Sequence, residues 1–209
     1  MPLAAVQTLL PLLGISRESK LLINIAKPVA SLICFFLSFS FITLAYTFIA
    51  DDFSLRLAAS HSNTALPFYY KISAVWGGHE GSMLLWILIL AGWTLAVALF
   101  SKDLPADMQA RVLSVMGMVA VGFLAFSLFT SNPFERNLPF APQDGSDLNP
   151  LLQDVGLIIH PPMLYLGYVG FSVAFAFAIA ALIGGHLDTA WARWTRPWTN
   201  MAWVFLTLG

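Results

Sequence analysis

The feature that most constrains this chain is a set of long apolar stretches with almost no charge. Residues 28–50, 81–100, 112–130 and 155–184 are each long enough to cross the roughly 30 Å hydrocarbon core of a bilayer as a helix. In lipid every backbone polar group must be bonded within the protein, so such stretches fold as helices. The chain is 58% hydrophobic and only 10% charged, against about 25% charged residues in soluble domains. These features predict an all-α, polytopic integral membrane helical bundle.

Two further apolar stretches, residues 2–15 and 198–209, are shorter and lie at the ends of the sequence. We expect them to be partial spans, with an interfacial helix as the alternative for either one. Residues 1–209 are then a single transmembrane domain, and we interpret the sequence as a fragment of a longer protein.

The basic residues predict the orientation of the bundle. Seven of the ten Lys and Arg residues lie in the short connections, whereas the two longer loops, residues 51–80 and 131–154, carry three basic and seven acidic residues. The positive-inside rule then places the short connections in the cytoplasm and the longer loops outside. A net charge of −1 gives no electrostatic case for nucleic acid. The basic aromatic segment 191–198 is typical of an anchor to lipid headgroups.

His160 is the main candidate for chemistry, because it is the only Asp, Glu, Lys, Arg or His between residues 155 and 183. An ionisable side chain in a span is by default a candidate functional residue. The sequence supports three roles about equally: a haem iron ligand, a proton relay, or a structural hydrogen bond at the kink that Pro161 and Pro162 predict. We expect a short helix over residues 150–159 that breaks at His160, before the chain crosses the membrane to residue 184. A second axial haem ligand would have to come from outside this chain, and a zinc site is disfavoured.

A second candidate surface follows from helical spacing. Trp76, His79, Met83, Trp86 and Trp93 fall on one stripe, which suits a planar ligand such as a porphyrin or a quinone. The alternative is that these tryptophans are interfacial anchors. With Glu80, the residues Trp76, His79 and Trp86 are a possible surface for haem or a partner.

Other histidines and the single cysteine have simpler interpretations. His61 is interpreted as a solvated loop residue, and His186 as a residue at a cytoplasmic helix end. Cys34 is alone in an apolar run, so the chain has no Cys-x-x-Cys-His segment for covalent haem attachment.

Several motifs resemble a known family, the CcmF haem lyases of bacterial cytochrome c maturation, with their NrfE and CcsA relatives. The similarity runs in order from about Ala50 onward. It is carried by Trp76-Gly77-Gly78-His79-Glu80-Gly81-Ser82, Thr130-Ser131-Asn132-Pro133-Phe134, Asp147-Leu148-Asn149-Pro150, Gly156-Leu157-Ile158-Ile159-His160-Pro161-Pro162 and Arg196-Pro197-Trp198.

The resemblance implies a multi-pass protein of the bacterial inner membrane whose functional face is periplasmic. Such proteins take haem from the chaperone CcmE and attach it to apocytochrome c, which CcmH- and CcmI-type subunits present. They also hold a b-type haem, and His160 matches the first of its two transmembrane histidine ligands. The resemblance assigns no catalytic residue here. Because the family's tryptophan-rich external segment and its other haem ligands lie downstream, we expect this stretch to be inactive by itself.

Two other classes of function stay open from the residues. One is a proton- or solute-transport subunit, with His160 as a relay and Glu80 as a gate, although the nearly uncharged spans count against it. The other is a purely structural assembly subunit.

Overall fold

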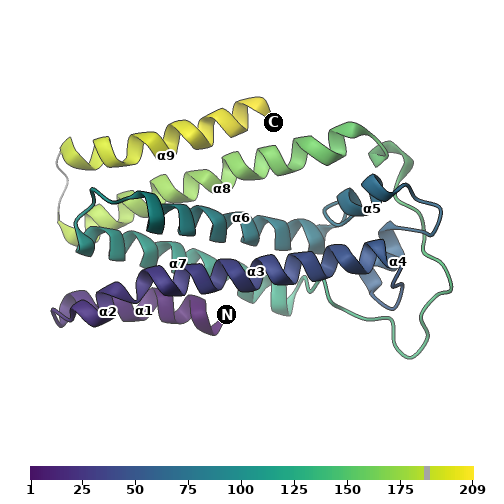
Figure 1. The fold of residues 1–209 in the computed structure, drawn as a ribbon, viewed down its shortest axis with the longest axis horizontal. Coiled ribbons are helices and arrows are strands. Elements are labelled where there is room, and N and C mark those ends of the chain that lie inside the picture. The colour runs from purple at the N-terminus through teal and green to yellow at the C-terminus, as the bar shows by residue number, and fades with distance from the viewer. Residues whose placement is uncertain (186–188) are drawn as a thin grey trace.

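The computed structural model describes residues 1–185 and 189–209, which form a bundle of helices (Figure 1). His186, expected at a helix end, lies outside the described residues. The elements are α1 (Pro2–Ser16), α2 (Lys20–Asn24), α3 (Ala26–Ile49), α4 (Arg56–His61), α5 (Phe68–Ala74), α6 (His79–Phe100), α7 (Ala106–Phe129), the 3-10 turn η1 (Pro150–Leu152), α8 (Val155–Gly184) and α9 (Thr189–Leu208).

Four segments of the described chain are long and apolar enough to cross a membrane: Lys20–Ile49, α6, α7 and α8. They run along the long axis of the molecule, with α1 and α9 on its flanks (Figure 1). The all-α, multi-pass bundle is therefore confirmed. The exact membrane boundaries of each span stay predictions.

The two ends of the bundle differ in construction. At one end the connections are short; Arg17 and Lys102 lie in them, and Lys20 begins α2. At the other end lie α4, α5 and the long connection between α7 and α8 (Figure 1). We call residues 50–78 and 130–154 together the cap. The basic connections and the cap therefore lie at opposite ends of the molecule.

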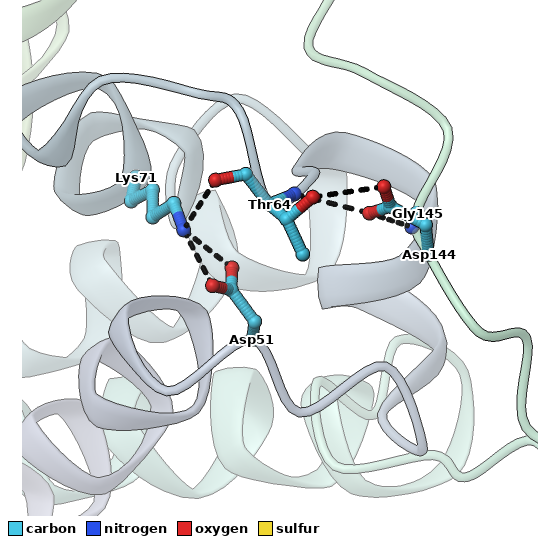
Figure 2. Close-up of polar contacts among 5 residues, drawn as sticks. All are labelled: Asp51, Thr64, Lys71, Asp144 and Gly145. Atoms are coloured by element: carbon cyan, nitrogen blue, oxygen red, sulfur yellow. Dashed lines mark hydrogen bonds and ion pairs between the residues drawn. The ribbon is translucent and has the colours of Figure 1, made fainter.

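Polar bonds hold the two halves of the cap together. Lys71, which is 8% exposed, places its ammonium 2.5 and 2.6 Å from the carboxylate oxygens of Asp51. The Thr64 carbonyl accepts a longer bond from the same ammonium, while the Thr64 N–H and hydroxyl donate to Asp144 (Figure 2). These four residues link the end of α3, the α4–α5 connection, α5 and the α7–α8 connection. The cap is thus a folded unit on the bundle.

Helices α8 and α9 pack closely because α8 presents glycines to α9. A Cβ at Gly167 would lie 2.6 Å from the Cβ of Leu206, and one at Gly170 would lie 2.7 Å from the Cβ of Ala202. Small residues at such crossings let helix backbones approach within a membrane. α8 therefore holds α9 along its length.

The start of α8 differs from the prediction. Pro161 and Pro162 lie inside one helix that runs from Val155 to Gly184, and the chain is interrupted earlier, between η1 and α8. Asp154 caps the helix, because its carboxylate accepts the Gly156 N–H at 2.7 Å. The expected helix over residues 150–159 and the break at His160 were therefore wrong. The Asp154 side chain, as the N-cap, thus fixes the start of α8 upstream of the two prolines.

Candidate functional site

His160 lies in the second turn of α8, near the cap end of the bundle, and its side chain is exposed. Its Nδ1 is hydrogen-bonded to the carbonyl oxygen of Gly209, next to the end of α9. A carbonyl can only accept, so Nδ1 donates, and in the neutral imidazole Nε2 is then the nitrogen with the lone pair. Histidines that bind metals commonly donate their other N–H to such a carbonyl. The imidazole therefore fits the role of an axial ligand to haem iron.

Trp76 does not lie on α6 but in the turn before it. Its indole N–H donates to the Leu157 carbonyl of α8 at 2.7 Å. Its ring stacks on Phe41 of α3, with 6.5 Å between centroids and 16° between planes. Trp76 thus connects α3 and α8, in addition to leading into α6.

His79 and Trp86 face α7. The Nδ1 of His79 shares a hydrogen bond of 2.8 Å with the Ser131 hydroxyl, and its ring lies edge-on to Phe126. Trp86 packs on Phe123, with ring centroids 3.9 Å apart. These contacts connect α6 to α7 and to the start of the α7–α8 connection.

Trp93 turns toward α8 and α9 instead. Its indole N–H donates to the Leu166 carbonyl at 3.1 Å, and its ring lies edge-on to Trp198 and Phe205. These four residues of the stripe therefore have different neighbours. Trp76 bonds α8, and Trp93 contacts α8 and α9. His79 and Trp86 contact α7. The structure does not bring these four side chains together around one planar ligand.

Glu80 lies half-buried in the first turn of α6. A carboxylate is favoured there by the partial positive charge at a helix N-terminus. Glu80 and His79 are thus side by side at the cap end of α6, on the end of the bundle that also holds His160. Their roles toward haem or a partner stay predictions.

Within residues 1–185 and 189–209, no group of three His, Cys, Asp or Glu side chains could hold a metal ion. Haem iron needs only a single axial side chain from each side, so this finding is compatible with His160 as a ligand. A cavity of about 750 Å³ lies at the opposite end of the bundle, lined by Phe100, Asp103, Arg193 and Trp198 among others.

Sequence reasoning missed the bond between Trp76 and Leu157. A signal for it was present in the sequence: Pro161 has no N–H, so the carbonyl four residues earlier, that of Leu157, needs another donor. The sequence could not identify which donor would reach it, since Trp76 is 81 residues away.

Comparison with known proteins places the chain in a family. A family model described as "Cytochrome C assembly protein" matches residues 76–209. The chain is 63% identical over 207 residues to "Cytochrome c-type biogenesis protein CcmF" of Pseudomonas aeruginosa, covering 99% of this chain and 32% of that protein. It is 55% identical to the protein of the same name from Escherichia coli, over 99% of this chain and 32% of the relative.

The fold of this chain is also similar to that of a solved structure. "Cytochrome c Heme Lyase CcmF" superposes with a TM-score of 0.83 at 28% identity, covering 99% of this chain and 32% of that one. The chain thus spans about a third of the length of the relatives that it matches. On the family model and on these identities, the chain belongs to the cytochrome c assembly protein family.

Proposed function

We propose that this chain is part of a membrane haem lyase, a holocytochrome c synthase, which attaches haem to apocytochrome c on the periplasmic side of the bacterial inner membrane. In this proposal it contributes His160 as one axial ligand of a b-type haem. The observation that carries the proposal is the exposed imidazole of His160, whose Nδ1–H is bonded to the Gly209 carbonyl, so that Nε2 is the nitrogen that would bind iron in the neutral ring.

The residues of this chain have defined tasks in the proposal. The Gly209 carbonyl holds the proton on Nδ1, which keeps the Nε2 lone pair available for iron. α8 presents the imidazole near the cap end of the bundle. A b-type haem held there would supply an electron to the iron of the incoming haem. A second residue that binds the haem iron would come from outside these residues.

The partners follow from the same proposal. A haem chaperone of the CcmE type delivers haem, and CcmH- and CcmI-type subunits present the thiols of the apocytochrome. The cap is the part of this chain that lies on the proposed periplasmic side. Glu80 and His79 adjoin the cap, so they would lie near the delivered haem and the apocytochrome. Membrane lipid covers the apolar flanks of the bundle.

A His160→Ala variant of the full-length protein tests the ligand assignment. We expect the purified variant to lose the b-type haem absorption that the wild-type protein shows, because iron loses one of two axial bonds. His61→Ala is the matched control: His61 is bonded within the cap, 3.2 Å from the Leu57 carbonyl, and should keep wild-type absorption. Wild-type haem content in His160→Ala would contradict the proposal. A colourless wild-type protein from haem-replete cells would favour a transport role instead.

A further inference from the structure

Pro161 leaves one backbone carbonyl of α8 without a hydrogen-bond donor from α8 itself. In a helix the N–H of residue 161 would donate to the carbonyl of residue 157, but proline has no N–H. An unbonded carbonyl in or beside lipid costs free energy. Leu157 therefore requires an outside donor, one helical turn before His160.

Trp76 supplies the missing hydrogen bond to Leu157, and its own position is fixed by other contacts. Its indole N–H lies 2.7 Å from the Leu157 oxygen. The ring is stacked on Phe41, and the Trp76 carbonyl accepts the Ser82 hydroxyl at 2.7 Å. The turn behind it is tight, since a Cβ at Gly81 would lie 1.6 Å from the Val75 carbonyl oxygen. Trp76 is therefore held by α3 and α6 while it bonds α8.

The bonded carbonyl belongs to the turn that carries the proposed ligand. Residues three apart lie on the same side of a helix, so Leu157 and His160 are neighbours on α8. A bond at Leu157 fixes how far this turn is rotated and how far it slides relative to α3 and α6. The direction of the His160 imidazole depends on both.

We propose that Trp76 is a positioning residue for His160: its indole N–H replaces the hydrogen bond lost at Pro161 and so fixes the turn of α8 that holds the imidazole. This inference rests on the proposed role of His160 as a haem ligand. It gives Trp76 a task on α8, and its place in a surface for haem or a partner stays a prediction.

The test uses the full-length protein and the variant Trp76→Phe, which keeps an aromatic ring but removes the N–H. We expect haem affinity to fall about tenfold, as for groups that orient a metal ligand. We also expect the visible and paramagnetic resonance spectra of the remaining haem to differ from wild type. A second variant, Trp76→Phe with Pro161→Ala, restores the backbone N–H at residue 161. It should recover the wild-type spectrum, because Leu157 then has a donor within α8.

Trp93→Phe is the matched control. It also removes an indole bond to an α8 carbonyl, that of Leu166. There, however, residue 170 is a glycine with its own N–H, so the carbonyl keeps its helical partner. The spectrum of the b-type haem should be unchanged in Trp93→Phe.

The outcomes separate the two proposals. Retained haem in His160→Ala refutes the ligand assignment itself. Loss of haem in His160→Ala together with wild-type affinity and spectra in Trp76→Phe refutes only the positioning role. Equal changes in Trp76→Phe and Trp93→Phe, or no recovery with Pro161→Ala, also refute it. If Trp76→Phe does not accumulate, accumulation and a wild-type spectrum in the double variant support the positioning role, and failure of both variants counts against it.

Discussion

Asp144 connects the two halves of the cap through one exposed carboxylate. Three donors converge on it: the Thr64 N–H at 3.0 Å, the Thr64 hydroxyl at 2.9 Å and the Gly145 N–H at 2.8 Å. The Thr64 backbone bond, followed by the other two, holds the pKa of Asp144 below its ordinary value, and the nearby Lys71 ammonium lowers it further. All of these groups favour the ionised carboxylate. The closure of the cap is therefore coupled to protonation of Asp144.

This coupling predicts a dependence of the cap on acid pH. A lowered folded-state pKa means that the stabilisation is complete above the unfolded value of about 3.9 and is lost as pH falls through the folded value. We expect proteolysis of the segment 131–154 to be constant from pH 7 to about pH 5 and to rise below about pH 4. An acid-tolerant protease measures it. In Asp144→Asn, which has no proton to gain, the rate should lack this rise; an equal rise in the variant would contradict the role of Asp144.

At the scale of the element, apolar length was enough to predict the long helices, but not their neighbours. α8 begins at Val155, where the apolar stretch begins, because Asp154 caps it. The sequence rules for proline predicted a break at His160 that did not occur. Pro161 leaves the Leu157 carbonyl without its helical donor, and Trp76 bonds that carbonyl. Such a bond depends on tertiary packing, which local rules do not contain.

The aromatic stripe illustrates the same limit. Helical spacing predicted that His79, Trp86 and Trp93 share one stripe of α6, but α6 contacts both α7 and α8. Small angular differences within the stripe therefore decide which helix each ring meets: Trp86 meets α7, whereas Trp93 meets α8 and α9. The sequence made His160 a candidate functional residue, because an ionisable side chain in an apolar span is a candidate by default, and its role as a ligand stays a prediction. The partner of its Nδ1 was not identifiable from the sequence, since Gly209 approaches it only through the packing of α9 on α8.

The turn into α6 gives a prediction at this scale. Gly81→Ala places a Cβ 1.6 Å from the Val75 carbonyl oxygen, so the backbone of the turn must move. We expect the free energy of unfolding to fall by about 3 kcal/mol or more, at or above the upper range for overpacking. Gly92→Ala, in the same helix, meets no atom within 4 Å and should be neutral or stabilising by up to about 1 kcal/mol. Thermal unfolding in detergent compares the two variants; similar midpoints would contradict the tight turn.

At the scale of the whole molecule, the basic residues of the short connections lie at the opposite end of the bundle from the cap. Arg17 and Lys102 in the short connections and Lys20 at the start of α2 lie at one end, and the cap lies at the other end (Figure 1). Basic short loops are retained in the cytoplasm, because they are costly to translocate. The proposed haem ligand His160 lies near the cap end. The proposed function thus requires the cap to be periplasmic.

Thiol labelling tests that orientation directly. Cys34, the only cysteine in residues 1–209, and any cysteine beyond them are replaced by alanine. Single cysteines are then introduced at two exposed positions, Gln143→Cys in the cap and Asp103→Cys in the α6–α7 connection. A maleimide that cannot cross the inner membrane should label Gln143→Cys in intact spheroplasts. It should label Asp103→Cys only after the membrane is permeabilised, since the positive-inside rule keeps that connection in the cytoplasm. The opposite pattern would place the cap, and the His160 end of α8 with it, on the cytoplasmic side, where it could not meet an apocytochrome in the periplasm.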